Sequence, residues 1–162
     1  MTIQEHMANS LRGNLDWLKN TVSDFSDAEL LVRPVPSANT PQWQIGHLIN
    51  TEARFMSTVG AKPVPLPAGF EDAFTKETAK IDSPTKFNTK AELFGLFDKI
   101  RAATIAWVSS ATPEQLAAPS PERIRAFAPT TLDLVQLNLG HVLMHMGQIQ
   151  VVRRKRGKPV MF

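Results

Sequence analysis

The sequence contains no cysteine among its 162 residues. Disulfide bonds, thiolate zinc sites and a cysteine nucleophile are therefore excluded. Any metal ion would have to be bound by imidazole or carboxylate groups, and any reactive thiol would have to come from a separate small molecule. The absence says nothing about the redox compartment, because a chain without thiols suits either one.

The sequence also lacks a long apolar run. No stretch approaches the roughly 20 apolar residues that a membrane-spanning helix requires. The first residues mix polar and apolar side chains, unlike a secretory signal. Hydrophobic residues make up 43% of the chain and charged residues 20%, as in an ordinary globular protein. We therefore expect one domain over residues 1–162, a cytoplasmic location and no membrane partner.

Positive charge is concentrated near the C-terminus. The formal net charge is +3, but acidic residues slightly outnumber basic ones elsewhere in the chain. A nucleic-acid-binding domain usually spreads its cations over a face that contacts several phosphates, whereas cations at the end of a helix complement its macrodipole. We therefore expect no nucleic-acid partner. The five terminal cations are Arg153, Arg154, Lys155, Arg156 and Lys158.

Four long segments carry apolar residues at spacings of three and four, the period of an amphipathic helix. Thr40 before Pro41, and Thr89 three residues before Glu92, are typical helix starts. No segment alternates with a period of two, so we predict an all-α four-helix bundle. The predicted long helices cover residues 2–22, 40–59, 89–110 and 130–155.

A long connection separates the second and third predicted helices. Residues 60–84 hold four prolines, and a connection of this length is usually functional or carries a small helix of its own. We predict a short helix over residues 70–81. A further helical turn is expected at residues 112–115, where a threonine precedes a proline.

Two histidines of the last helix are four residues apart. His141 and His145 therefore lie on one face, one turn above the other, in a geometry that can bind one metal ion. This helix is apolar nearly all round, which turns the histidine face inward. Buried imidazoles need partners. A metal ion would satisfy both rings, and hydrogen bonds to carbonyls or water are the alternative.

A third histidine, His47, lies in the second helix after Gly46, just as His141 follows Gly140. Glycine inside a helix often marks a close helix–helix approach. We therefore expect ligands from two helices to converge where the backbones come near. The fourth histidine, His6, has polar neighbours, and we expect it to be exposed to solvent.

The two histidine motifs together resemble the DinB-like superfamily, whose relatives include mycothiol-dependent maleylpyruvate isomerase and bacillithiol transferase. The motifs are W-x-x-G-H-L in the second helix and H-x-x-x-H-x-G-Q-I in the last, and the resemblance covers almost the whole chain. Many members read H-E-x-H-H-R-G-Q, whereas Val142, Met144 and Met146 stand at the other polar positions here. The residues that carry the resemblance are Trp43, Gly46, His47, His141, His145, Gly147, Gln148 and Ile149.

The resemblance implies that His47, His141 and His145 bind a divalent metal ion, and zinc or nickel are our first expectations. Three protein ligands leave a coordination position open, as in catalytic sites. A water or thiol there would ionise more readily. The family chemistry implied is the transfer or addition of a low-molecular-weight thiol, and the implied assembly is a homodimer.

Residues around the expected site are candidates for binding a small-molecule substrate. On the second helix, Asn50, Thr51 and Arg54 share the face of His47, and Arg54 could bind a carboxylate. Gln148 follows His145 by one turn and could orient a ligand. The alternatives are a solvated arginine and a packing glutamine.

The long connection, with Phe70 and Phe74, could cover the metal or serve only as a structural cover. Glu52 points away from His47, which leaves no obvious general base. Three hypotheses follow: a metal-dependent transferase or hydrolase, a non-catalytic metal-binding helical protein related to stress, and a purely structural bundle.

Overall fold

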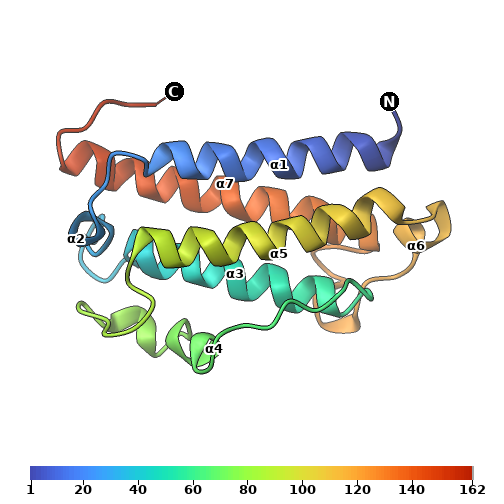
Figure 1. The fold of residues 1–162 in the computed structure, drawn as a ribbon, viewed down its shortest axis with the longest axis horizontal. Coiled ribbons are helices and arrows are strands. Elements are labelled where there is room, and N and C mark those ends of the chain that lie inside the picture. The colour runs from blue at the N-terminus through green and yellow to red at the C-terminus, as the bar shows by residue number, and fades with distance from the viewer. Residues whose placement is uncertain (162) are drawn as a thin grey trace.

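The computed structural model describes residues 1–161, and its four long helices lie side by side (Figure 1). Within those residues there is no β-strand, only an isolated bridge between Pro119 and Thr130. The predicted all-α four-helix bundle is therefore confirmed. The long helices are α1 (Ile3–Thr21), α3 (Pro41–Ser57), α5 (Lys90–Ser110) and α7 (Thr131–Lys155).

Each long helix begins after a threonine whose side chain accepts a backbone N–H of the first turn. The expected starts at Thr40 and Thr89 are confirmed, and Thr130 rather than Thr131 caps the last helix. Such a cap satisfies a backbone donor that has no partner within the helix, which fixes where each helix begins.

The directions of the helices explain the length of one connection. The colours of Figure 1 show that α1 and α7 run one way and that α3 and α5 run the other way. Each of α1 and α3 packs against both α5 and α7. Because α3 and α5 are parallel neighbours, the chain between them must return along the whole bundle, and residues 58–89 do so.

That connection contains two short helical pieces, α4 (Phe70–Ala73) and η1 (Thr78–Lys80), rather than the single helix predicted over residues 70–81. The break falls at Thr75, whose backbone N–H donates to the Thr78 hydroxyl at 2.9 Å. Threonine side chains that bond nearby backbone groups compete with helix continuation.

Three further short elements complete the fold. The turn expected near residue 112 is confirmed as α6 (Pro113–Ala117), and η2 (Glu122–Ile124) follows it. The short α2 (Asp27–Leu30) was not predicted, although Ser26 and Glu29 form its capping box.

A buried ion pair interrupts the largely apolar interior of the bundle. Arg101 and Glu52 are each 2% exposed. The guanidinium donates from Nε and Nη2 to the two carboxylate oxygens at 3.0 and 2.8 Å, and its Nη1 donates to the Leu11 carbonyl. This pair links α1, α3 and α5 within the core.

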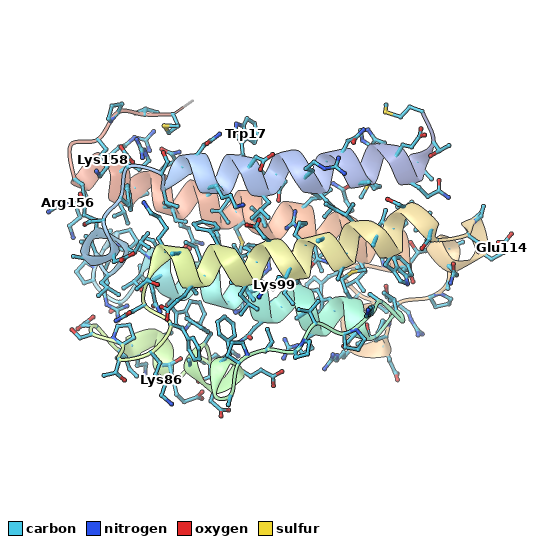
Figure 2. The ribbon with its side chains drawn as sticks, in the orientation of Figure 1. Trp17, Lys86, Lys99, Glu114, Arg156 and Lys158 are labelled. Carbon is cyan, nitrogen blue, oxygen red and sulfur yellow. The ribbon has the colours of Figure 1, made fainter. Side chains whose placement is uncertain are left out.

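Much of the last helix, α7, is buried against the rest of the protein. Leu139 and Met146 are buried, whereas Leu143 is 46% exposed. At its C-terminal end Arg153 is buried and donates to the Thr21 carbonyl and the Asp24 carboxylate at 2.8 and 2.6 Å. Arg153 therefore ties α7 to the end of α1. Arg156 and Lys158 pair with Glu29 of α2, near which Figure 2 shows them.

Among the described residues, no helix combines the length and the apolar character that crossing a bilayer requires.

Candidate metal centre

The three histidines His47, His141 and His145 come together between α3 and α7. Each offers one ring nitrogen, and these three nitrogens lie within 4.8 Å of one another. His47 is in the second turn of α3, and the other two lie near the middle of the antiparallel α7. The antiparallel contact of the two helices places the three rings at one level of the bundle.

The nitrogen spacing fits coordination of one ion. The Nε2 atoms of His141 and His145 are 3.1 Å apart. Two imidazoles on a tetrahedral zinc, with bonds of about 2.0–2.1 Å, have nitrogens about 3.4 Å apart. The His47 nitrogen is farther away and would have to approach by roughly 1 Å to complete that geometry. Two ligand nitrogens are therefore already near the spacing that one ion requires, and the third, that of His47, would have to move closer.

Burial keeps the imidazoles neutral. It lowers the pKa of His145 to about 3 and that of His141 to about 4, with neighbouring histidines as a smaller cause. The pKa of His47 is also lowered, first by burial and then by the charge of Arg54. A neutral imidazole has the free lone pair that a metal ion requires. Protons are therefore not competitors for this site near pH 7.

Gln44 fixes the orientation of His145, a role that sequence reasoning missed. Its side chain is fully buried, and its Oε1 lies 3.0 Å from His145 Nδ1. Its own Nε2 donates to the Asn39 carbonyl at 2.8 Å, which leaves Oε1 facing the ring as an acceptor. His145 must then carry its proton on Nδ1, and its Nε2 lone pair faces His141.

His47 is held by an aromatic neighbour. The ring of Trp43 stacks on it with centroids 4.8 Å apart and planes at 9°. Trp43 Nε1 in turn donates to the Thr75 carbonyl at 3.2 Å, in the segment between α4 and η1. The long connection therefore supports the centre through a tryptophan.

The two glycines beside the histidines have different surroundings. A Cβ on Gly46 would lie 2.2 Å from the ring of Phe74, so this glycine allows a close approach, but to a side chain of the long connection and not to another helix. Gly140 is exposed, with nothing within 4 Å of a Cβ placed there. The expectation that Gly140 marks a close helix contact is wrong, because that side of α7 faces outward.

Of the two roles considered for Phe70 and Phe74, the structure shows the structural one. Phe70 and Phe74 are 1% and 5% exposed, and their rings pack against each other and against Phe87 in the core. Core packing is the role that the structure assigns to both rings.

The candidate substrate-binding residues occupy different environments. Asn50 is half-buried and donates to the Glu71 carbonyl at 3.3 Å, and Thr51 is buried at 5% exposure. Arg54 is exposed, and its charge reaches His47. Gln148 is exposed on α7, and its hydrogen bond opposes the lowered pKa of His145. The fourth histidine, His6, is exposed on α1, as expected.

Glu52 takes no part in the histidine cluster, since its carboxylate is occupied by Arg101. The cluster therefore contains imidazoles alone among the described residues.

The fold and the site define a four-helix bundle with an all-imidazole candidate metal centre. The sequence profile of the DinB superfamily matches residues 10–149, and the chain belongs to that superfamily. Among solved structures, it is similar to the conserved protein of locus from Enterococcus faecalis, with 18% identity, coverage of 98% of this chain and 99% of that chain, and a TM-score of 0.70. At this identity the likeness concerns the fold alone. The comparison with curated proteins gives no match.

Proposed function

We propose that the protein is a divalent-metal-dependent enzyme that transfers a low-molecular-weight thiol to an electrophilic small molecule. The observation that carries the proposal is the pair of neutral imidazoles of His141 and His145, whose Nε2 atoms face each other at 3.1 Å with His47 beside them. When bound there, a zinc or nickel ion would supply a Lewis acid that lowers the pKa of a coordinated thiol or water.

The three histidines serve as ligands and leave the remaining coordination positions to the substrate. Gln44 keeps the lone pair of His145 directed at the ion. Arg54 is the cation next to the centre and is suited to bind a carboxylate of the thiol or of its acceptor. Gln148, at the exposed edge of α7, is suited to orient the bound molecule, and Asn50 and Thr51 line the same face of α3.

The proposed reaction joins sulfur to carbon. A thiol RSH and an electrophile R′–X give RSR′ and HX, so that the S–H and C–X bonds break as the S–C bond forms. The chain has no cysteine, so the sulfur comes from the small molecule. No carboxylate belongs to the histidine cluster within residues 1–161, and the thiol proton therefore passes to solvent. With water in place of the thiol, the same site would hydrolyse R′–X.

The second candidate is a metal-binding helical protein without catalysis, of the kind associated with stress. The absence of a carboxylate base from the described cluster favours it. Both candidates require the metal, and only the first requires turnover.

The deciding experiment compares His141→Ala with the matched control His6→Ala, in protein purified without a histidine tag. We expect about one metal ion per chain in wild type and in the control, and none in His141→Ala, by elemental mass spectrometry. Equal metal content in all three would refute the metal centre. A cobalt-loaded sample titrated with a small thiol should change its visible spectrum, and turnover of thiol and electrophile should disappear on chelation. Metal without turnover would favour the second candidate.

We also propose that the protein is a cytoplasmic homodimer. Leu143, Met144 and Val151 are 46%, 52% and 40% exposed along α7, and such apolar side chains favour association. Light scattering on the purified protein tests this assembly, and a monomeric mass would refute it.

A further inference from the structure

A cavity of about 450 Å³ lies on the side of α3 that faces α5, beneath the segment 61–72. None of the three histidines lines it. Its volume is within the range of roughly 300–1,000 Å³ typical of small-molecule sites. The histidines therefore lie outside the cavity, although Arg54 lines it and its charge reaches His47.

The outer wall of the cavity is stiff. Residues 63–67 read Pro-Val-Pro-Leu-Pro and run back along α3 (green in Figure 1). Proline fixes its own φ and holds the preceding residue in an extended conformation. Val64 and Leu66 are partly buried against the core, and the three prolines that alternate with them are exposed. Such a segment resists collapse onto the helices, which keeps the cavity open.

The floor is apolar and the rim is charged. Met56, Ala61 and Ile100 are 3%, 5% and 3% exposed in the floor. Four charged side chains stand on the exposed rim, and none of them forms an ion pair within the part of the chain that the structure describes. They are Arg54, Lys62, Glu71 and Asp72.

The two signs of charge occupy different ends of the cavity. The Glu71 carbonyl accepts a hydrogen bond from Asn50, which places the backbone that carries Glu71 and Asp72 beside the middle of α3. The backbone N–H of Ala61 donates to the Met56 carbonyl, so Lys62 lies beyond the C-terminal end of the helix. Because α3 rises 1.5 Å per residue, Arg54 lies about 6 Å along the helix from Asn50, and the end of the helix, beyond which Lys62 lies, is about 10 Å from Asn50.

We infer that this cavity binds a short zwitterionic compound of the length of a tripeptide with free termini. Its ammonium group lies at Glu71 and Asp72, its carboxylate lies at Arg54 and Lys62, and an aliphatic side chain rests on the floor. An extended tripeptide spans about 10 Å, which matches the separation of the charged ends. The histidines do not line this site, and Arg54 is the candidate substrate-binding residue that it shares with the proposed function.

The test uses Ala-Leu-Ala as the probe, together with its N-acetylated and its C-amidated forms, in calorimetric titrations of the full chain. The free tripeptide should bind more tightly than either blocked form, each of which lacks one charge. Arg54→Gln should weaken binding of the free tripeptide by about two- to fivefold, and removal of Lys62 as well should bring the loss to the order of tenfold.

Matched pairs of ligand and variant make the test specific. Arg54→Gln should leave binding of the amidated probe unchanged, because that probe has no carboxylate for Arg54 to bind. Glu71→Gln should leave binding of the acetylated probe unchanged, because that probe has no ammonium group for Glu71 to bind. The controls are Arg12→Gln and Glu114→Gln, which remove two exposed charges that do not line the cavity. Circular dichroism checks the fold of each variant.

Several results would overturn the inference. These are no binding of Ala-Leu-Ala at millimolar concentrations, equal binding of all three probes, or equal losses in the rim variants and the controls. Binding should persist in His141→Ala. Loss of binding in that variant would contradict a site separate from the histidines, whereas its persistence alongside absent metal would separate this site from the proposed enzyme function.

Discussion

Two polar clusters interrupt the apolar interior of the bundle, and they are satisfied in different ways. At Arg101, every hydrogen bond of the guanidinium ends on an oxygen of the same chain, and the Glu52 carboxylate neutralises its charge. At the histidines, three neutral rings turn nitrogens toward one another, while Trp43 stacks on His47 and Gln44 bonds to Nδ1 of His145.

The difference separates a structural cluster from a candidate functional one. A buried charge that meets its counter-charge and its remaining acceptors needs nothing from solution. In the neutral pair, the Nε2–H of His141 can donate to the Nε2 lone pair of His145 at 3.1 Å, because each neutral imidazole carries one N–H. A metal ion can take the place of that proton, so the histidine cluster, unlike the ion pair, has ligand atoms to offer to a cation from solution. The following predictions test that contrast, from the largest expected effect to the smallest.

Glu52→Leu should destabilise the protein by about 3–5 kcal/mol, because it leaves the Arg101 charge buried without its counter-charge. Urea unfolding measures the effect. The double variant Glu52→Leu with Arg101→Met should recover most of the loss, and Asp98→Asn, which removes a surface pair with Lys19, should cost at most about 1 kcal/mol. Equal losses in the single and double variants would contradict a self-sufficient ion pair.

The chelated protein should lose stability as the pH falls below 6.5. The pKa of His141 is lowered from 6.5 to about 4 and that of His145 to about 3. Between these values and 6.5 the unfolded chain binds protons that the folded chain does not, so acid favours unfolding. We expect a loss of about 3 kcal/mol between pH 6.5 and 5 that is specific to the two histidines.

The control for this pH effect is a variant with glutamine at both positions, which should lack that part of the pH dependence while keeping the part due to carboxylates. Urea titrations at each pH give the comparison. The same slope in the variant and in wild type would show that the rings are not held neutral by burial.

Gln44→Leu should weaken metal binding by about 10–100-fold, since it removes the acceptor that holds the proton of His145 on Nδ1. Competition with a chelating dye measures the affinity, and the 15N shifts of the His145 ring report the tautomer. Gln44→Glu keeps an acceptor and should restore much of the affinity. The matched control is Gln42→Leu, a buried glutamine of the same helix that donates to the Phe87 carbonyl. Equal affinity in both leucine variants would remove the positioning role.

The long helices and the shared direction of His141 and His145 could be predicted because both depend on periodicity within one helix, whereas the meeting with His47 followed from the family resemblance. Apolar spacing and threonine caps fix α1, α3, α5 and α7, and the four-residue spacing fixes the direction of two imidazoles. The short α2 could not be found in this way, since four residues have no period. The contact of Gln44 with His145 could not be predicted either, because the sequence does not show which side chain an inward-facing glutamine meets across the bundle.

The Gly-His steps show the same limit. Gly46 and Gly140 each precede a histidine, yet the absence of a side chain at Gly46 makes room for the ring of Phe74, whereas Gly140 faces outward. Only the path of the long connection, which depends on α3 and α5 being parallel, decides between the two environments.

The smallest expected effect tests the backbone beside the histidine cluster. Gly140→Ala should stabilise the protein by about 0.5–1 kcal/mol, because an exposed helical glycine loses more conformational freedom on folding than alanine does, and its Cβ would meet nothing within 4 Å. Gly46→Ala should instead cost about 1–3 kcal/mol, since the ring of Phe74 is buried and must shift. Thermal unfolding of the chelated proteins measures both.

Because α7 keeps its course in Gly140→Ala, the metal content of this variant should equal that of wild type. A destabilised Gly140→Ala would mean that this side of α7 is covered in solution, as it would be in the proposed homodimer, and light scattering on the same sample would then show whether association had been lost.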